Sequence, residues 1–399
     1  MKKKNLGAAI VAAIAIFITI SSLLLVGCET EKNETRERRV TININDSQDV
    51  GIADFIDSVR FIGLQTLDES LINFINNVYF INDKIIAVDP FQRQILFFDK
   101  EGNFLHRIKK TGQGPGEYMG ITASLLDPVR ETVMIYSIAS RKMVFYGLDG
   151  TFVKEIIGFS DNALIRSIMN LPNGHFLCYT HDLLPKDVGE YSGLWEVDSD
   201  GKFVRSFFTL QELYPVQYNM DNSPLTLLPD GIISLQDAQF NDIYHYRGDS
   251  LTKYLSYEIQ NDKLPDFKGL TYTEERYTKG MTSQDKGDYI FTKWMDGKEH
   301  FYTVYSKKND HTALVYPAKK FWASDRVAEP NAFNCIDSNL SGVLVTSITG
   351  TAIPDIMANE NISPEIKEKL QKIVHGMSEK DIEDMNPVLQ LLYVKPQRK

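Results

Sequence analysis

The sequence repeats one β-hairpin pattern at intervals of about 50 residues. Residues 89–108 align with residues 137–156 at a constant offset, and residues 193–207 continue the series. In each copy, a strand of alternating apolar residues runs into a turn that contains Asp and Gly, and the next strand starts at once with Phe. Glycine supplies the positive φ that a tight turn needs, and aspartate caps its own turn. Weaker copies lie at residues 242–257 and 301–316, so we expect five hairpins of one kind.

Another turn and strand precede several of these hairpins, at residues 81–89, 171–180 and 228–237. Each unit therefore contains three or four short antiparallel strands, and one such unit cannot bury both of its faces alone. A closed ring of units can bury them all, so we predict an all-β propeller. Five hairpins and one composite unit give six blades, and seven remain possible because residues 258–300 are hard to parse.

The composite unit comes from the two ends of the chain. Residues 40–66 contain two short strands, and residues 386–396 form another. Pairing them in one sheet would close the ring and remove its free edges. Between them, residues 363–385 predict a two-helix insertion, because Ser363 and Ser378 are suitable N-caps, each before a short helical pattern.

The loop after the first hairpin reads GQGPGEY and could be taken for a phosphate-binding loop. A P-loop needs Lys-Ser or Lys-Thr after its last glycine and a helix after that, and neither follows here. We therefore interpret the loop as a structural corner that crosses from one blade to the next, with the tyrosine packed over the join. Its residues are Gly112, Gly114, Pro115, Gly116 and Tyr118.

The first repeat with its loop, residues 85–118, resembles an NHL repeat. The similarity lies in the Ala-Val-Asp strand that ends at Asp89, the Arg93-x-Ile-x-x-Phe-Asp strand, the Gly-x-Phe turn, and the glycine-rich loop that ends in an aromatic residue. The GQGPGEY form is typical of the six-bladed β-propeller lipoproteins of Gram-negative envelopes. The resemblance extends over residues 40–399 and implies a fold, but no settled activity.

The first 39 residues have the pattern of an exported lipoprotein. Three lysines precede an apolar run, and Leu-Val-Gly-Cys28 resembles the bacterial lipobox. We predict a lipoprotein signal peptide over residues 1–27, lipid attachment at Cys28, and a flexible charged tether over residues 28–39 that joins a propeller at 40–399. The lipid would anchor the protein in the outer membrane, and the acidic residues after Cys28 resemble surface-export signals. An uncleaved membrane anchor is the alternative.

Charge and motif content exclude several functions. The chain has 43 Lys and Arg against 53 Asp and Glu, a net charge of −10, which disfavours nucleic acid as a partner. Neither CxxC nor HExxH occurs, and no Gly-x-Ser-x-Gly elbow is present, so we predict no metal, no cofactor and no catalytic residue from local motifs. Cys178 and Cys335 are expected to be free thiols, although a disulfide between them stays open.

Arg93 and Arg141 occupy equivalent positions just before a strand in the first two repeats. If both face one end of the ring, they could bind carboxylate or sulfate groups of a ligand. The alternative, which we favour, is that each arginine pairs with an acid of a neighbouring blade.

Two functions of different classes fit these observations. The first is an envelope binding or scaffold module that holds a protein, peptide or glycan on a face of the ring, where loops converge. The second is an envelope glycan hydrolase or lyase, with carboxylates or histidines from several blades meeting in the central channel. The absence of a catalytic motif favours binding over catalysis, and the fold itself decides nothing.

Overall fold

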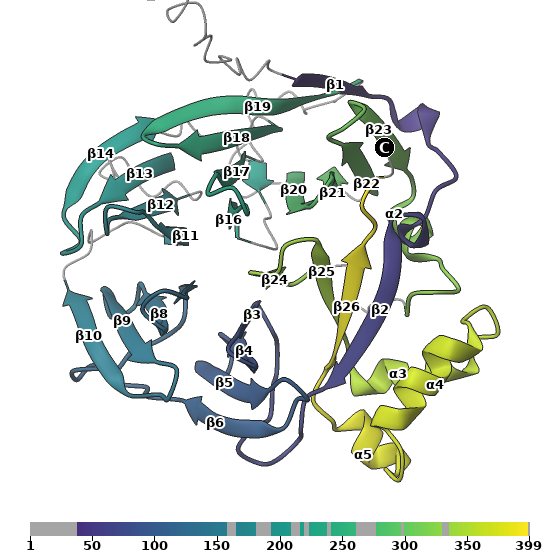
Figure 1. Ribbon diagram of the computed structural model, residues 1–399, viewed down its shortest axis with the longest axis horizontal. Coiled ribbons are helices and arrows are strands. Elements are labelled where there is room, and N and C mark those ends of the chain that lie inside the picture. Colours follow the sequence, from purple (N-terminus) through teal and green to yellow (C-terminus); the bar gives the residue numbers. More distant parts are fainter. Residues whose placement is uncertain are drawn as a thin grey trace, which may run out of the picture. The chain divides into compact units, whose positions relative to one another are not determined.

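The computed structural model describes residues 38–157, 165–180, 193–208, 216–218, 223–237, 241–260, 277–296, 299–328 and 335–397. From residue 39 onward the chain forms one compact unit, in which six mainly antiparallel sheets stand around a central axis (Figure 1). The prediction of a six-bladed β-propeller is therefore confirmed, and the seven-bladed alternative is wrong. Cys28, the predicted signal peptide and most of the tether lie outside the described residues.

The first three blades each contain the four strands of one sequence repeat, with the last strand outermost (Figure 1). Blade 1 consists of β3 (Asn77–Ile81), β4 (Lys84–Asp89), β5 (Gln94–Asp99) and β6 (Phe104–Ile108), with β24 (Asp337–Ser338) added beside β3. Blade 2 consists of β7 (Ala123–Asp127), β8 (Thr132–Ser137), β9 (Lys142–Gly147) and β10 (Phe152–Ile157). Blade 3 consists of β11 (Ile165–Asn170), β12 (Phe176–Thr180), β13 (Gly193–Val197) and β14 (Phe203–Phe208).

Blades 4 and 5 each gain one strand from a distant part of the chain. Blade 4 consists of β16 (Leu225–Leu227), β17 (Ile233–Asp237), β18 (Asp242–Arg247) and β19 (Ser250–Ile259), and β1 (Arg38–Ile42) pairs with β19. Blade 5 consists of β20 (Tyr277–Lys286), β21 (Tyr289–Asp296), β22 (Glu299–Ser306) and β23 (His311–Val315), and β15 (Val216–Tyr218) pairs with β20.

Blade 6 joins the two ends of the propeller. It contains β25 (Val343–Ile348), β26 (Val388–Val394) and β2 (Ile56–Gly63), and β2 pairs antiparallel with β26 along its whole length. Figure 1 shows the N-terminal strand β2 as the outer strand beside the C-terminal strand β26. The predicted closure of the ring by its two ends is confirmed.

The segment that leads to β2 runs along the outer margin of three blades. β1 pairs with β19 of blade 4, and the Gln48 N–H then donates to the Leu314 carbonyl of blade 5 at 2.7 Å. Two short 3₁₀ turns, η1 (Ile44–Asp46) and η2 (Ile52–Asp54), lie on this path before β2 reaches blade 6. The sequence did not predict the placement of β1 on blade 4.

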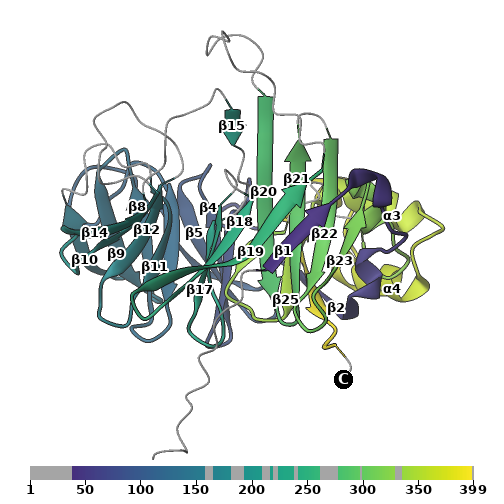
Figure 2. The same cartoon turned by 90° about the horizontal axis from the view of Figure 1, so that it is seen from above.

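The helices lie mainly between β25 and β26, outside the ring (Figures 1 and 2). The two predicted helices are α4 (Pro364–Ile373) and α5 (Glu379–Glu383), and Ser363 and Ser378 cap them as expected. The turn η4 (Gly350–Ala352), α3 (Ile353–Ala358) and α2 (Ala318–Trp322) were not predicted. No helix among the described residues is long and apolar enough to span a membrane.

Six apolar clusters fill the six spaces between neighbouring blades. Successive residues of β4 point to opposite sides: Ile85 and Ala87 pack toward blade 6, whereas Ile86 and Val88 pack toward blade 2. This explains why the inner strands are apolar without interruption, since both faces of each blade are buried. Cys178 is buried in one of these clusters, and it and Cys335 are free thiols, as expected.

We predict that the buried Gln390 side chain stabilises blade 6, in which the ring closes. Its amide oxygen accepts the Ala328 N–H at 3.0 Å, and its amide nitrogen donates to the Ala328 carbonyl and the Thr346 hydroxyl, each at 2.9 Å. Gln390→Leu keeps the apolar packing but leaves the buried N–H and carbonyl of Ala328 without hydrogen-bond partners. We expect it to lower the free energy of unfolding by about 2–4 kcal/mol in urea titrations. Lys372→Ala, on the exposed side of α4, is the control, and equal stability of the two variants would contradict the prediction.

Candidate functional site

The two ends of the ring differ in what they carry. Because strand direction alternates within a blade, the turn between its second and third strands lies at the same end as the connection to the next blade. We call this the connection end. The turns between first and second and between third and fourth strands lie at the opposite end, which we call the hairpin end. Figure 2 shows the ring from its side, with the two ends above and below.

The GQGPGEY loop lies at the connection end between β6 and β7, and its backbone amides bind carboxylates of the chain itself. The Gly114 N–H donates to Glu117 at 2.9 Å, and the Gly116 N–H donates to Glu155 at 3.0 Å. Lys142, which is buried, donates to Glu155 and to the Gly114 carbonyl. The places that a phosphate would take in a binding loop are thus filled by glutamates. A side chain at Gly112 would collide with Glu117, 2.0 Å away.

Tyr118 lies at the end of this loop in the apolar cluster between blades 1 and 2. Its ring is fully buried, and its hydroxyl donates to the carbonyls of Arg93 and Ile108 at 2.9 and 3.2 Å. Pro115 at the tip is exposed. This geometry agrees with the interpretation of the loop as a corner between blades.

Arg93 and Arg141 lie in equivalent turns, β4–β5 and β8–β9, at the connection end. Both have a positive φ, 54° and 52°, and both are exposed. The alternative that we favoured for Arg93 was an ion pair with a neighbouring blade, but this side chain forms no ion pair with any carboxylate of the described residues. Its charge is therefore available to a ligand.

A group of polar side chains surrounds the propeller axis, where the inner strands meet. Asp337 on β24 is buried, and its carboxylate accepts the Ser223 N–H and, at 3.0 Å, the Gln284 side-chain amide. The Ser223 hydroxyl contacts Ser167 of blade 3. The Asp337 carboxylate thus joins β24 to blade 5 and to Ser223, just before β16 of blade 4, and the Ser223 hydroxyl extends the contacts to blade 3. We call these residues the axial cluster.

Burial dominates the electrostatics of the axial cluster. It raises the pKa of Asp337 from 3.8 to about 6, although the Ser223 N–H, Gln284 and the nearby charge of Lys286 favour the ionised form. Burial also lowers the pKa of Lys286, whose ammonium group donates to the Leu340 carbonyl at 2.9 Å. Both Asp337 oxygens accept hydrogen bonds from the protein, so the carboxyl is arranged to hold blades together rather than to meet a substrate.

A small cavity lies between blades 4 and 5. Its volume is about 10 Å³, which is room for one water molecule. The buried Asp285 carboxylate lines it; one oxygen accepts a hydrogen bond from Lys307, whereas Oδ2 has no protein partner. The cavity suits a structural water and is too small for a peptide or glycan.

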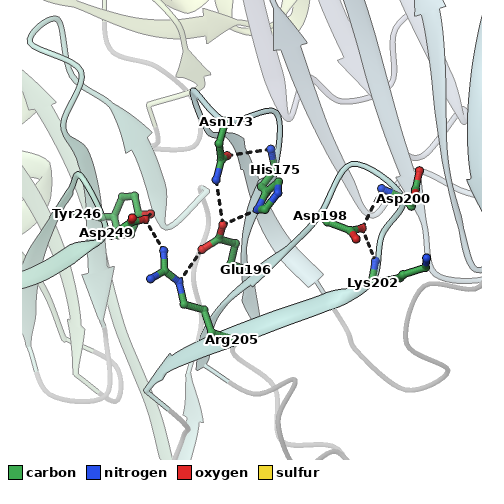
Figure 3. Close-up of polar contacts among 9 residues, drawn as sticks. All are labelled: Asn173, His175, Glu196, Asp198, Asp200, Lys202, Arg205, Tyr246 and Asp249. Atoms are coloured by element: carbon green, nitrogen blue, oxygen red, sulfur yellow. Dashed lines mark hydrogen bonds and ion pairs between the residues drawn. The ribbon is translucent and has the colours of Figure 1, made fainter.

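A second polar network lies at the hairpin end, between blades 3 and 4 (Figure 3). The buried Glu196 carboxylate accepts from His175 at 2.6 Å, from Arg205 at 2.7 Å and from Asn173 at 3.3 Å. Burial alone would raise the pKa of Glu196, but these hydrogen bonds outweigh it and lower the pKa below its usual value. Arg205 also pairs with Asp249 in the β18–β19 turn of blade 4.

A histidine beside a buried carboxylate can act as a general base. Here the network extends into blade 4. Arg205 donates to Asp249, and Tyr246 also donates to Asp249, at 3.2 Å (Figure 3). The network therefore ties two blades together. Nearby, Asp198 accepts the backbone N–H groups of Asp200 and Lys202, each at 2.9 Å, which closes an ordinary hairpin turn. In the described part of the chain, no three His, Cys, Asp or Glu side chains could hold a metal ion.

The connection end of blade 1 exposes four large apolar side chains. Phe91 in the β4–β5 turn is 72% exposed, and Leu67, Leu71 and Phe74 in the segment between β2 and β3 are 45, 46 and 44% exposed. The rings of Phe74 and Phe91 pack edge to face, with centroids 5.6 Å apart. We call these four residues the blade-1 surface. Leu67 and Leu71 lie in the same eight-residue segment as Phe74, and grouped exposed apolar side chains mark interaction sites more often than scattered ones.

Buried polar side chains hold the backbone beneath the blade-1 surface. The Asp89 carboxylate accepts the N–H of Asn73 at 2.8 Å and that of Gln92 at 3.0 Å, so one buried group fixes the residues next to both phenylalanines. Gln94, also buried, donates to the Leu71 carbonyl at 2.7 Å. The buried Ser70 hydroxyl accepts the Leu67 N–H at 2.9 Å.

Asn386 fixes the same segment from the other end of the sequence. Its side chain accepts the Ile72 N–H at 2.9 Å and donates to the carbonyls of Gln65 and Ser70 at 2.9 and 2.8 Å. Its own N–H donates to the Thr66 hydroxyl. The surface is thus held in one conformation before any ligand arrives, which reduces the entropy cost of binding.

Sequence analysis missed the blade-1 surface. Its residues are not part of the repeated hairpin pattern, and an apolar residue in a turn is normally expected to pack against the core. The signal that could have found it is Pro-Phe91, an aromatic residue at the tip of a predicted β-turn where polar residues are usual.

Comparison with known proteins agrees with the fold. The fold and its surface define a six-bladed β-propeller with a preformed apolar patch on one blade. The family model described as "Domain of unknown function (DUF4934)" matches residues 38–393, and the chain belongs to this family. The search of the curated proteins found no match.

Solved structures show the same architecture at low sequence identity. A protein of Bacteroides fragilis NCTC 9343, named as a candidate exported protein, is 17% identical with a TM-score of 0.73, covering 90% of this chain and 99% of that one. A DUF4221 family member from Bacteroides vulgatus ATCC 8482 is 8% identical with a TM-score of 0.51, covering 86% and 98%. Virginiamycin B lyase from Staphylococcus aureus is more distant, with 13% identity, a TM-score of 0.42 and coverage of 74% and 83%.

The axial carboxyl predicts a specific pH dependence of stability. The folded chain keeps the Asp337 proton up to a pH near 6, whereas the unfolded chain releases it near 3.8. In this window the folded state binds more protons, so the stability contributed by Asp337 falls as the pH rises, by about 3 kcal/mol in total. Asp337→Asn stays neutral and, with a flipped Gln284 amide, keeps both hydrogen bonds. We expect the stability of Asp337→Asn relative to the parent to rise between pH 4 and 7 in urea titrations. A pH-independent difference would contradict this.

The contacts of Asn386 predict a local effect on the blade-1 surface. Asn386→Ala leaves the Gln65 and Ser70 carbonyls and the Ile72 N–H without their buried partner. We expect a loss of about 2–4 kcal/mol of unfolding free energy and faster amide hydrogen exchange confined to residues 65–76. Asn361→Ala, on the exposed end of the helical insertion, is the matched control. Unchanged exchange in residues 65–76 would show that other contacts hold the segment.

Proposed function

We propose that this protein is a cell-envelope binding module that holds a protein, peptide or glycan against the connection end of blade 1. One observation carries the proposal: four large apolar side chains are exposed on a backbone that buried Asp89, Ser70, Gln94 and Asn386 hold rigid. Hydrogen bonds compensate the burial of these polar groups, and large apolar side chains left exposed on a backbone fixed in this way are a feature of interaction sites. A preformed patch of this kind binds with little rearrangement.

The N-terminal sequence supports a location in the envelope. Residues 1–27 have the pattern of a lipoprotein signal peptide, and Cys28 is the lipid-attachment residue that this pattern predicts. Anchoring at Cys28 in the outer membrane would keep the propeller at the membrane surface on its charged tether. The name of the Bacteroides fragilis neighbour as a candidate exported protein agrees with this location.

The enzyme alternative has less support. A glycan hydrolase of the usual kind needs two carboxyls facing a substrate pocket. The axial Asp337 is buried and spends both oxygens on protein donors, and Glu196 at the hairpin end binds three side chains of its own and neighbouring strands. Both carboxylates are therefore occupied by structural contacts, whereas the blade-1 surface is free to meet a ligand.

Photo-crosslinking from the blade-1 surface tests the proposal. Phe91 is replaced by p-benzoylphenylalanine in cells that make the full chain, and Val129 is replaced in a matched control. Val129 is 90% exposed in the β7–β8 turn, at the hairpin end. We expect a discrete adduct from position 91, about tenfold stronger than from position 129, because only the former lies at a binding surface.

The adduct from position 91 must also depend on its neighbours. Adding Leu71→Ser and Phe74→Ser should abolish it while leaving the thermal unfolding temperature nearly unchanged, since both side chains are about half exposed. Equal labelling from positions 91 and 129, or no adduct from position 91, would overturn the proposal. Mass spectrometry of the adduct then identifies the ligand as protein or glycan.

A further inference from the structure

Three cations lie directly beside the blade-1 surface. Arg93 is two residues from Phe91 in the same turn. The Lys109 ammonium contacts the side chain of Gln92 at 3.4 Å, and the Arg107 guanidinium donates to the Glu69 carbonyl at 3.0 Å. All three side chains are exposed. The basic groups therefore border the apolar patch on the side of Phe91 and along β6.

None of these three cations forms an ion pair with a carboxylate of the described residues. Several cations elsewhere in the chain are paired: Lys142 with Glu155, Arg205 with Glu196, and Lys253 with Asp242. Acidic residues outnumber basic ones in the whole chain, 53 to 43. Cations left unpaired in an acidic protein, next to an exposed apolar patch, are complementary to a ligand that carries negative charge.

The chemistry of the patch favours a polypeptide over a glycan or a lipid surface. Phe74, Phe91, Leu67 and Leu71 carry no hydrogen-bonding group, whereas sugar recognition requires polar partners for the hydroxyls. Asp68 and Glu69 stand between the two leucines and would repel an anionic membrane, which presents negative charge across the whole surface; a peptide can keep its carboxylates away from these two residues. A polypeptide can place apolar side chains on the patch and carboxylates beside Arg93 and Lys109 at the same time.

We infer that the ligand of the blade-1 surface is a polypeptide segment that carries apolar side chains interleaved with carboxylates. Its apolar side chains cover the Phe74–Phe91 pair and the two leucines, and its carboxylates pair with Arg93, Lys109 and Arg107. This inference rests on the proposed function and adds the chemical class of the ligand. The aromatic pair supplies most of the affinity, and the cations supply the preference for acidic sequences.

The test uses the full propeller and three fluorescein-labelled peptides of one length. The acidic probe is Gly-Glu-Phe-Glu-Leu-Glu-Phe-Gly; the basic probe has Lys in place of Glu, and the polar probe has Ser in place of Phe and Leu. By fluorescence anisotropy, we expect the acidic probe to bind at least about tenfold more tightly than either of the others. Its affinity should fall as salt is added, because the contacts are partly exposed charge pairs.

Matched variants assign the binding to the surface. Phe91→Ser should weaken the acidic probe by about tenfold, and Val129→Ser should not change it. Arg93→Asn with Lys109→Gln should weaken it by about five- to tenfold and flatten the salt dependence. Asparagine is chosen at position 93 because it tolerates the positive φ found there. Arg326→Gln, an exposed cation beyond α2, is the charge control.

The outcomes separate this inference from the proposed function. If position 91 crosslinks a ligand in cells but the acidic probe binds no better than the basic one, the inference on chemistry is wrong and the binding function stands. The inference is overturned if the acidic probe does not bind, whereas vesicles of phosphatidylcholine and phosphatidylglycerol, or heparin, do bind to this surface. The ligand is then a lipid or a glycan. If position 91 crosslinks nothing, the proposed function itself fails.

Discussion

The pairing of β2 with β26 is the interaction on which the rest of this structure depends. Every blade packs on both of its faces, as Ile85 and Ile86 on successive positions of β4 show, so a ring with one open joint would expose two apolar faces at once. Closure joins residues more than 300 positions apart in sequence, so forming it costs considerable chain entropy. Blade 1 packs closely against the end of β2 at this joint. A side chain at Gly102 would lie 2.1 Å from the Gly63 carbonyl.

The features that the sequence predicted are those that depend on contacts between residues close together in the chain. The hairpins were predictable because Gly102, Gly150 and Gly201 mark equivalent turns, and all three have a positive φ. The caps of α4 and α5 were predictable for the same reason, since Ser378 and Asp381 are three residues apart. The placement of β1 on blade 4 was not, because a single strand with no turn partner carries no signal for the sheet it joins.

The blade-1 surface was unpredictable for a further reason: it inverts the usual pattern of burial. In this segment Ser70 is buried and Leu71 is exposed, and in the turn below it Asp89 is buried while Phe91 is the most exposed of the four apolar residues. Reasoning from polarity assigns each of these residues to the wrong side. Such local conflicts between residue type and environment are expected at functional sites, where the rest of the fold provides the stabilisation.

The buried polar networks and the blade-1 surface have separate roles in the ring. The axial cluster and the Glu196 network fix the blades relative to one another, and neither presents a free carboxylate to a ligand. Because the blades are fixed, a surface on one blade is as rigid as the whole propeller, and Asn386 extends that rigidity from the closing blade to residues 65–72. Changes at Gln390 or Asp337 should therefore act on stability, whereas changes at Phe91 or Arg93 should act on binding. On the proposed function, a rigid surface of this kind would bind its ligand without rearrangement, and its specificity would come from the chemistry of the exposed side chains.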